Sequence, residues 1–363
     1  MTDFMTKNKE KLEQFAAMSQ AAGSRSDYVQ GGGGNTSVKL ADGLMAIKAS
    51  GYCLSDIRPD KAYAVLDYEA LRRFYYGNEP AQLADVEKLG SACAKENTKL
   101  IEGMDALRPS VEAGFHSILK TFVCHTHSVY ANLAACSAAC CEIAEKAFNG
   151  ADYTWGWVPY TDPGANLTFA IRDELRRVEE KTGKVPSVIL MQNHGIIVHD
   201  DDAAERCLAI HADANERLAQ QFGIHGDSFP AISVRQTGEE LYEADTPYLR
   251  EALKNCRYDY KTFIETPLYP DQMVFLIGTF FMDKEGTPAE GECYADTRTG
   301  ALVLHMGEKK AKTITETLTA VIFIMDTITK MGYTVSTMGE AAKSFIANWE
   351  SEKYRKSLAG KKG

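Results

Sequence analysis

The chain has 363 residues, of which 45% are hydrophobic, and its formal net charge is −10 at pH 7. This length predicts two domains, and the composition is that of a globular protein with a sizeable core. The acidic balance argues against nucleic-acid and anionic-membrane partners, although local amides and single cations can still hold a phosphate group. The nine cysteines show no paired framework, and no apolar run approaches a signal core or a membrane span. We therefore expect reduced thiols and a cytoplasmic protein.

A helix is predicted first along the chain, followed by a small β-rich segment. Residues 6–22 place apolar side chains near one helical stripe, and four glycines, Gly31 to Gly34, then break this pattern. Alternation and turn residues predict strands over 35–40, 44–48 and 65–67, the first two joined as a hairpin. Helices are expected next, over 69–76 and 81–101.

The middle of the chain alternates helices and strands. Pro109 and Ser110 predict a helix through residue 120, with Ser110 as its candidate N-cap and Glu112 in its first turn. Two apolar runs predict buried strands, one ending in His-x-His at residues 122–127 and one over 188–198. The other expected elements are helices over 128–137, 142–148, 166–182 and 200–222 and a strand over 153–159.

The composition turns polar around residues 226–238, where we place a domain boundary. The prediction is a catalytic domain over 1–225 and a second, α+β domain over 235–363, whose role the sequence does not reveal. The expected elements of this second domain are strands over 273–277, 279–282, 292–296 and 301–306 and helices over 311–331 and 338–358.

Three histidines form a candidate metal site. His125 and His127 lie two residues apart, so on a strand they share one face. His194, on the second apolar run, could complete a three-nitrogen site that leaves room for a substrate, so that the metal acts as a Lewis acid. The alternative is unrelated core histidines on two buried strands, because His-x-His is short and common. Glu112 either complements a helix dipole or, if it is close to the metal, serves as a general base.

A candidate anion site lies earlier in the chain. The glycines Gly31 to Gly34 before Asn35 could expose consecutive amides in an anion-binding nest, although they match neither a Walker loop nor Gly-x-Gly-x-x-Gly. Lys48, Ser50 and Gly51 end the returning strand of the hairpin, which could bring them beside Asn35 to complete a phosphate pocket. The alternatives are a flexible loop and an ordinary exposed lysine entering a turn.

Taken in order, these motifs resemble the class II aldolase/adducin family from about residue 10 to residue 222. The matching segments are residues 33–37, 48–51, 109–112, 125–128, 158–160, 163–164 and 193–197. Residues 31–39 and 268–271 also resemble the aldolase part of rhamnulose-phosphate aldolase/dehydrogenase fusions, whose dehydrogenase part has no counterpart here.

The resemblance implies a three-layer αβα catalytic domain, which together with the smaller C-terminal α+β domain makes an α/β protein. It implies Zn²⁺, or another divalent cation such as Mn²⁺ or Co²⁺, held by His125, His127 and His194, with Glu112 as the catalytic acid/base. The substrate- and phosphate-binding positions that it implies are Gly34, Asn35, Lys48, Ser50, Gly51 and Ser110. One departure is Val111, which stands where related fuculose-phosphate aldolases have a serine, so the presence and geometry of a phosphate stay open.

The activity implied is that of a Zn-dependent aldolase, which cleaves a ketose 1-phosphate to dihydroxyacetone phosphate and an aldehyde through a metal-stabilised enediolate. Two alternatives use the same metal site: dehydration, and 4-epimerisation of a sugar phosphate, whose family branch carries Asp where this chain has Glu112. An adducin-like non-enzymatic scaffold is disfavoured, because the three histidines and Glu112 are all present. The family also implies a homotetramer, whereas the sugar and the aldehyde are not legible in the sequence.

Overall fold

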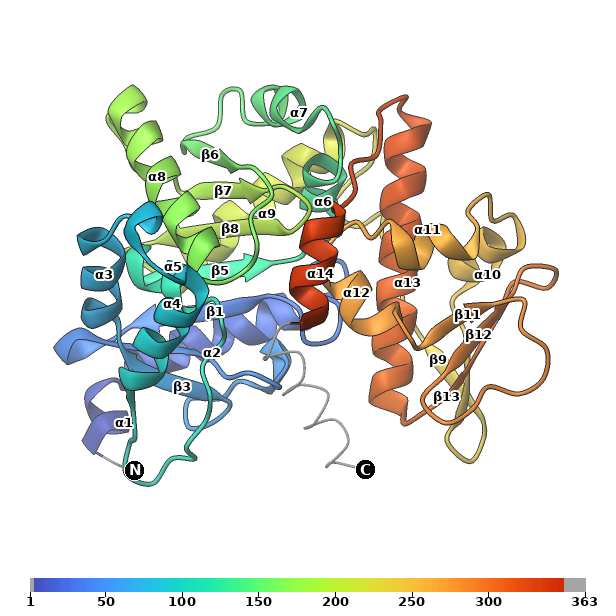
Figure 1. Ribbon diagram of the computed structural model, residues 1–363, viewed down its shortest axis with the longest axis horizontal. Coiled ribbons are helices and arrows are strands. Elements are labelled where there is room, and N and C mark those ends of the chain that lie inside the picture. The colour runs from blue at the N-terminus through green and yellow to red at the C-terminus, as the bar shows by residue number, and fades with distance from the viewer. Residues whose placement is uncertain (1–2, 349–363) are drawn as a thin grey trace.

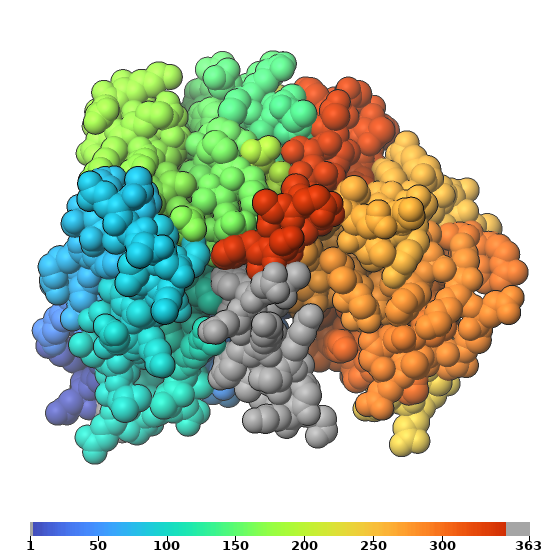
Figure 2. All heavy atoms as spheres, in the orientation of Figure 1, coloured from blue at the N-terminus to red at the C-terminus, as the bar shows by residue number. Residues whose placement is uncertain are grey.

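The structure is a computed structural model that describes the backbone of residues 3–348 and the side chains of residues 3–345. It contains two β-sheets, with the long helix α13 (Glu308–Lys330) between them (Figure 1). In the space-filling view, the helix α14 (Glu340–Asn348) lies where the two sheet-based units meet (Figure 2). Within residues 3–348, no helix is both long and apolar enough to span a membrane.

An eight-stranded sheet forms the centre of the first unit. Within residues 3–348 its neighbouring strands are all antiparallel except β6 and β7. In spatial order the strands are β4 (Thr98–Lys99), β3 (Tyr63–Asp67), β2 (Leu44–Lys48), β1 (Asn35–Lys39), β5 (Phe122–Thr126), β8 (Gly195–Asp200), β7 (Val188–Met191) and β6 (Trp155–Val158). The strand β5 therefore lies in the middle, with β1 on one side and β8 on the other.

Helices cover both faces of this sheet (Figure 1). One face carries α2 (Lys9–Gly23), α6 (Val129–Ala135), α7 (Cys140–Ala147) and α9 (Ala204–Gln220), preceded by the short α1 (Asp3–Lys7). The other face carries α3 (Tyr68–Gly77), α4 (Val86–Glu96), α5 (Ala113–Ile118) and α8 (Ala165–Thr182). Successive residues of β5 alternate between two cores, since Cys124 packs with Leu218 of α9 and Val123 packs with Phe115 of α5. The predicted three-layer αβα arrangement is confirmed.

A five-stranded sheet forms the second unit. In spatial order its strands are β11 (Phe280–Met282), β12 (Cys293–Asp296), β13 (Ala301–His305), β10 (Leu241–Ala244) and β9 (Val234–Gly238). The helices of this unit, besides α13 and α14, are α10 (Pro247–Lys254), α11 (Tyr260–Glu265) and α12 (Pro270–Leu276). Residues 3–348 also include three short 3-10 helices, all in the first unit: η1 (Ala41–Gly43), η2 (Leu54–Asp56) and η3 (Pro80–Gln82). The smaller α+β unit after the first is therefore also confirmed, whereas the domain boundary between residues 225 and 235 stays a prediction.

The helix α13 joins the two units. It packs against α6 of the first unit and against α12, β9 and β10 of the second. Buried side chains occur all around it, which is expected for a helix enclosed by protein. Four of these buried residues are threonines, and the hydroxyl of each donates to the carbonyl four residues earlier, at 2.7–3.0 Å: Thr313, Thr315, Thr317 and Thr319. These bonds satisfy hydroxyl groups that burial would otherwise leave without partners.

The apolar run over 188–198 is two strands and not the single strand predicted. Met191 of β7 pairs with Gly195 of β8, and residues 192–194 form the turn between them. Asn193 (φ 51°) and Gly195 (φ 158°) adopt the positive φ angles that this reversal needs, and Asn and Gly tolerate such angles well. His194 therefore lies in a turn at the end of the sheet.

Two predicted helices in the first unit are shorter than expected. The helix predicted over 81–101 is η3 followed by α4, which ends at Glu96, and residues 98–99 add the edge strand β4. The helix predicted from Ser110 begins only at Ala113 as α5. Ser110 is not its N-cap, because Glu112 occupies that position. The amide of Ser110 instead donates to the carbonyl of Lys48 at 3.2 Å and holds this segment to the end of β2.

The second unit departs most from the prediction. The strand predicted over 273–277 is the helix α12, which has Pro270 in its first turn, where the fixed φ of proline suits a helix start. The hairpin β9–β10 and the helices α10 and α11 were not predicted. The helix predicted over 338–358 begins at Glu340 as α14, and the part beyond residue 348 lies outside the described residues.

Candidate metal centre

The three predicted histidines converge at one end of the eight-stranded sheet. His125 lies in β5, His127 follows directly after that strand, and His194 lies in the turn between β7 and β8. Because β5 pairs with β8, that turn is brought beside the end of β5. All three side chains are buried, and each offers a ring nitrogen within 4.8 Å of the other two. The predicted set therefore exists as a cluster, although His127 is one residue beyond the strand.

Hydrogen bonds orient two of the imidazoles toward each other. Nδ1 of His125 lies 3.0 Å from the carbonyl oxygen of Ile196, and Nδ1 of His127 lies 2.6 Å from Oδ2 of Asp271. Both oxygens accept, so each Nδ1 carries the proton and each Nε2 presents a lone pair. Burial lowers the pKa of His125 well below its ordinary value and keeps that ring neutral. The two Nε2 atoms nevertheless face each other at 3.2 Å, an arrangement that a cation between them would stabilise.

Glu112 adds a carboxylate to the same cluster. It occupies the N-cap position of α5, and its Oε2 accepts a hydrogen bond of 2.6 Å from Nδ2 of Asn35. Its oxygens lie 3.6 Å from Nε2 of His125 and 3.2 Å from Nε2 of His194. Burial acts to raise the pKa of Glu112, but the imidazoles of His125, His194 and His127 outweigh it and hold the pKa well below the usual range. The side chain is therefore an ionised carboxylate directed at the histidines.

Two buried atoms of the cluster lack a hydrogen-bond partner among the described residues: Oε1 of Glu112 and Nδ1 of His194. Buried polar atoms without partners are rare in proteins and are costly. Three imidazoles suit zinc and other late first-row metals, and a three-ligand site leaves a coordination position open. The donor set and these atoms fit a divalent cation together with a polar ligand.

Asn35 is held in place by a fourth histidine, His116 of α5. Its Oδ1 is hydrogen-bonded to Nε2 of His116, while its Nδ2 donates to Ser110 (3.1 Å) and to Glu112. Nδ1 of His116 is bonded to the hydroxyl of Ser37 at 2.6 Å. Burial lowers the pKa of His116 to about 3, so the ring is neutral and donates through one nitrogen only. His116 thereby fixes which end of the Asn35 amide faces Glu112.

The predicted phosphate residues come together in part. The amide of Ser50 donates to the carbonyl of Arg108 (2.9 Å), and the amide of Ser110 donates to the carbonyl of Lys48, so the two loops run side by side. Nζ of Lys48 is buried and donates to the carbonyls of Gly32 (3.3 Å) and Tyr52 (2.8 Å). The hydroxyl of Ser50 is buried and has no hydrogen-bond partner among the described residues. The Ser50 corner, formed by Lys48, Ser50 and Ser110, therefore has in this hydroxyl a donor that a ligand could use.

The two predicted glycines differ in their surroundings. Gly34 has φ 64°, and a Cβ there would lie 2.6 Å from the carbonyl oxygen of His125, so close approach to β5 requires glycine. Gly51 has φ 87° and is exposed. Of these two glycines, Gly34 is therefore the one that lies against the strand carrying His125.

A cleft of about 1330 Å³ opens beside Ser110. Its wall also includes Val111 and the apolar Phe345 of α14. Charged side chains of both signs line it, four basic (Lys88, Lys95, Lys99 and Arg108) and four acidic (Asp85, Glu87, Asp105 and Asp162), so the lining by itself selects no charge of ligand.

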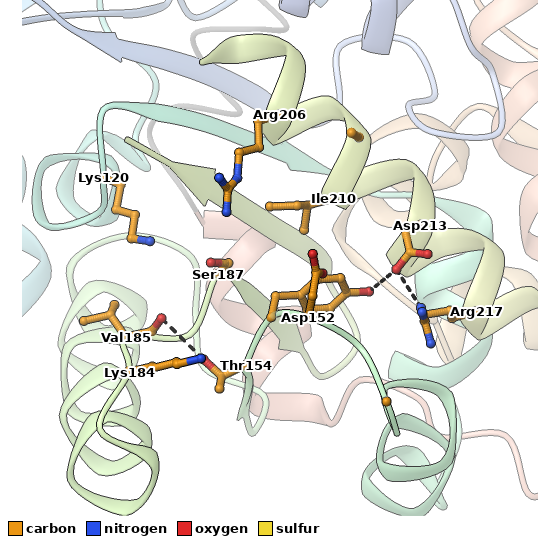
Figure 3. A pocket seen from close by; sticks show the side chains of 13 residues that line it. Lys120, Asp152, Thr154, Lys184, Val185, Ser187, Arg206, Ile210, Asp213 and Arg217 are labelled. Atoms are coloured by element: carbon orange, nitrogen blue, oxygen red, sulfur yellow. Dashed lines mark hydrogen bonds and ion pairs between the residues drawn. The ribbon is translucent and has the colours of Figure 1, made fainter. Parts of the chain in front are cut away.

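A second cavity, of about 810 Å³, lies near β6 and α9 (Figure 3). Charges of both signs line it, and there Asp213 accepts hydrogen bonds from Tyr153 (2.7 Å) and Arg217 (2.6 Å). None of the predicted site residues lines this cavity, so it is separate from the histidine cluster.

Comparison with known proteins identifies the first unit. The family model described as Class II Aldolase and Adducin N-terminal domain matches residues 13–222. The N-terminal class II aldolase domain of a conserved Thermoplasma acidophilum protein is 20% identical, with a TM-score of 0.47, and the match covers 58% of this chain and 92% of that chain. An aldolase II superfamily protein from Pseudomonas syringae is 14% identical (TM-score 0.42; 61% and 76% covered), and an L-fuculose 1-phosphate aldolase is 19% identical (TM-score 0.37; 59% and 88% covered). A search of curated protein sequences found no match.

Proposed function

Because the chain belongs to the class II aldolase and adducin family, we propose that it is a Zn²⁺-dependent aldolase, which cleaves a ketose 1-phosphate to dihydroxyacetone phosphate and an aldehyde. The observation that carries the proposal is the convergence of three buried imidazoles within reach of one ion, two of which, those of His125 and His194, lie beside the carboxylate of Glu112. A structural zinc site would be closed by a fourth protein ligand, whereas three nitrogens leave a position for substrate.

His125, His127 and His194 would hold the cation, and Mn²⁺ or Co²⁺ could replace Zn²⁺ with the same ligands. When bound, the cation supplies polarisation of the substrate carbonyl and stabilises the negative charge that develops on carbon–carbon cleavage. The other parts of the reaction belong to the side chains around it.

Glu112 is assigned the proton transfer. Its Oε2 already accepts the hydrogen bond from Asn35, while its Oε1 has no hydrogen-bond partner among the described residues. We therefore assign the proton to Oε1. In cleavage this atom would accept the proton of the substrate hydroxyl that becomes the aldehyde oxygen and then deliver it to the substrate carbon left by cleavage, and in synthesis the same two transfers would run in reverse. The bond from Asn35 keeps the carboxylate in one orientation through both steps.

The phosphate group is assigned to the corner around Ser50. The hydroxyl of Ser50, which has no hydrogen-bond partner within the described part of the chain, and the backbone amides of Gly34 and Gly51 would donate to it. Ser110 lies beside Ser50. Lys48 would act through its charge, because its Nζ already donates to two carbonyls. Val111 supplies no hydroxyl here, so the corner has one donor fewer than in fuculose-phosphate aldolases.

The test is the release of dihydroxyacetone phosphate from a panel of ketose 1-phosphates by zinc-loaded protein, with and without a chelator. Release that a chelator abolishes and added Zn²⁺ restores is the expected result. If zinc-loaded protein releases none, NMR spectra of the same sugars would show whether they are epimerised or dehydrated, and either product would contradict cleavage. Protein that binds no metal would contradict all three activities and favour a scaffold.

A homotetramer is proposed on the family resemblance alone. The mass of the full chain in solution, measured by light scattering, tests it. A monomer or dimer would contradict the tetramer without affecting the metal site.

A further inference from the structure

The carboxylate that orients His127 comes from outside the region that the family model matches. Asp271 is the second residue of α12, in the C-terminal unit, and 144 positions separate it from His127. Its side chain is buried, and its Oδ2 lies 2.6 Å from Nδ1 of His127. A buried carboxylate needs such a partner, because its charge is costly to remove from water.

The polypeptide around Asp271 is fixed to the same cluster by further bonds. The side-chain amide of Asn193, the neighbour of His194, donates to the carbonyls of Leu268 and Ser336, both at 2.8 Å. The glycine-rich loop is also held, since the amide of Gly31 donates to Glu316 of α13 at 3.1 Å. Segments of the C-terminal unit thus contact the loop before β1, the residue after β5 and the turn before β8.

The glycine-rich loop leaves the space that Asp271 occupies. A Cβ on Gly33 would lie 2.4 Å from Oδ2 of Asp271 and 3.0 Å from Nδ1 of His127. A Cβ on the neighbouring Gly32 would meet nothing within 4 Å. The absence of a side chain at residue 33 is therefore required by the carboxylate–imidazole pair and not by the loop in general.

We infer that Asp271 is a positioning residue of the metal centre, through which the C-terminal unit controls metal affinity. By accepting from Nδ1 of His127, the carboxylate fixes the tautomer whose Nε2 faces the other histidines, and it makes that nitrogen a stronger donor. This inference rests on the proposed metal-binding role of the histidines but is independent of the reaction. It gives residues 235–348 a function that the sequence did not reveal.

The test is the affinity of the full-length chain for Zn²⁺ and Co²⁺, measured by competition with a chromogenic chelator. Loss of the group that accepts the other ring N–H of a metal-binding histidine typically weakens metal binding about 10–100-fold. We expect Asp271→Ala to lose affinity in this range and Asp271→Asn to lose less, because an amide oxygen still accepts a hydrogen bond but carries no charge. The absorption spectrum of the protein at saturating Co²⁺ should also change, which a purely structural role would not produce.

A matched control is Asp259→Asn. This exposed aspartate is the N-cap of the adjacent helix α11, and asparagine caps helices equally well, so the same charge is removed at no cost to the fold. Its metal affinity should equal that of the unmodified protein. Unchanged affinity and an unchanged Co²⁺ spectrum in Asp271→Ala would overturn the inference.

A second pair of variants covers the case in which Asp271→Ala does not fold. Gly33→Ala should weaken Co²⁺ binding by displacing the Asp271–His127 pair, whereas Gly32→Ala should not. Equal affinities in these two variants would contradict the inference. Because all these measurements are made without substrate, failure of the proposed aldolase activity would leave them interpretable, and the reverse also holds.

Discussion

The histidine cluster and the Ser50 corner were both predicted from short motifs, but they differ in how far the protein has organised them. In the cluster, His125 and His127 are each oriented by a partner on the far ring nitrogen, and Glu112 is oriented by Asn35. In the Ser50 corner, the lysine cation is engaged by backbone carbonyls and the serine hydroxyl has no hydrogen-bond partner among the described residues. The difference indicates that the histidine cluster is already organised for the proposed cation, whereas the Ser50 hydroxyl would gain a partner from the proposed anion. Substitutions in the histidine cluster should therefore have the larger effects, on metal content and kcat. Substitutions in the Ser50 corner should instead change KM.

The largest effect is expected for His127→Ala. Removal of a direct ligand should cost more than the roughly 100-fold that loss of an outer partner can cost, so zinc should be lost on gel filtration and turnover with it. Metal content by mass spectrometry checks this. The exposed His225, which pairs with Glu216 at 3.0 Å, offers a control, because His225→Ala should keep the metal. Retention of stoichiometric zinc in His127→Ala would show that the cluster is not the metal site.

Glu112→Gln should separate metal binding from catalysis. The amide keeps the size of the side chain but cannot exchange a proton, so kcat should fall by about 10²–10⁴-fold, the usual contribution of a general acid or base. Metal content should stay unchanged, because the three imidazoles remain. A near-normal kcat would show that Glu112 is not the proton carrier, even if the metal is bound as proposed.

The histidine cluster could be predicted in part from local patterns. His-x-His on an apolar run places two imidazoles on one face of a strand, and His194 lies on the second apolar run. The prediction of a single strand over 188–198 was wrong. The residues on both sides of the turn are apolar, so the hydrophobic periodicity does not show where one strand ends and the next begins. The three histidines nevertheless lie together as predicted, since the pairing of β5 with β8 determines where His194 lies.

Asp271 and His116 could not be predicted as parts of the site. The contact between Asp271 and His127 spans 144 residues, and no local pattern records it. The run after Pro270 was predicted as a strand, because short apolar runs fit strands and helices alike, and this error hid the helix that carries Asp271. His116 belongs to none of the motifs in the sequence, and its bond to Asn35 joins residues that lie 81 positions apart. Long-range polar contacts of this kind follow from packing and not from periodicity.

In the Ser50 corner, Ser50→Ala should affect binding rather than turnover. A hydrogen bond to a charged group contributes about 1.5–3 kcal/mol, so KM for a phosphorylated ketose should rise about tenfold or more while kcat changes little. Since Ser50 Oγ makes no hydrogen bond among the described residues, the melting temperature of the ligand-free protein should not fall. The exposed Ser55 is the matched control, and Ser55→Ala should leave KM unchanged. A loss of stability in Ser50→Ala would show that the hydroxyl serves the fold.

The smallest effect is expected for Val111→Ser, which restores the hydroxyl of the fuculose-phosphate aldolases. Val111 is half-buried at the wall of the cleft that Ser110 also lines, so an added hydroxyl would lie close to the proposed phosphate. A neutral donor at a partly solvated position is worth about 0.5–1.5 kcal/mol, which predicts a fall in KM of about threefold for a ketose 1-phosphate. The corresponding unphosphorylated ketose should show no change, since it has no group for the hydroxyl to bind. Equal cleavage of both sugars by the unmodified chain, with no response to Val111→Ser, would mean that the Ser50 corner binds something other than phosphate and that only the metal centre is shared with sugar-phosphate aldolases.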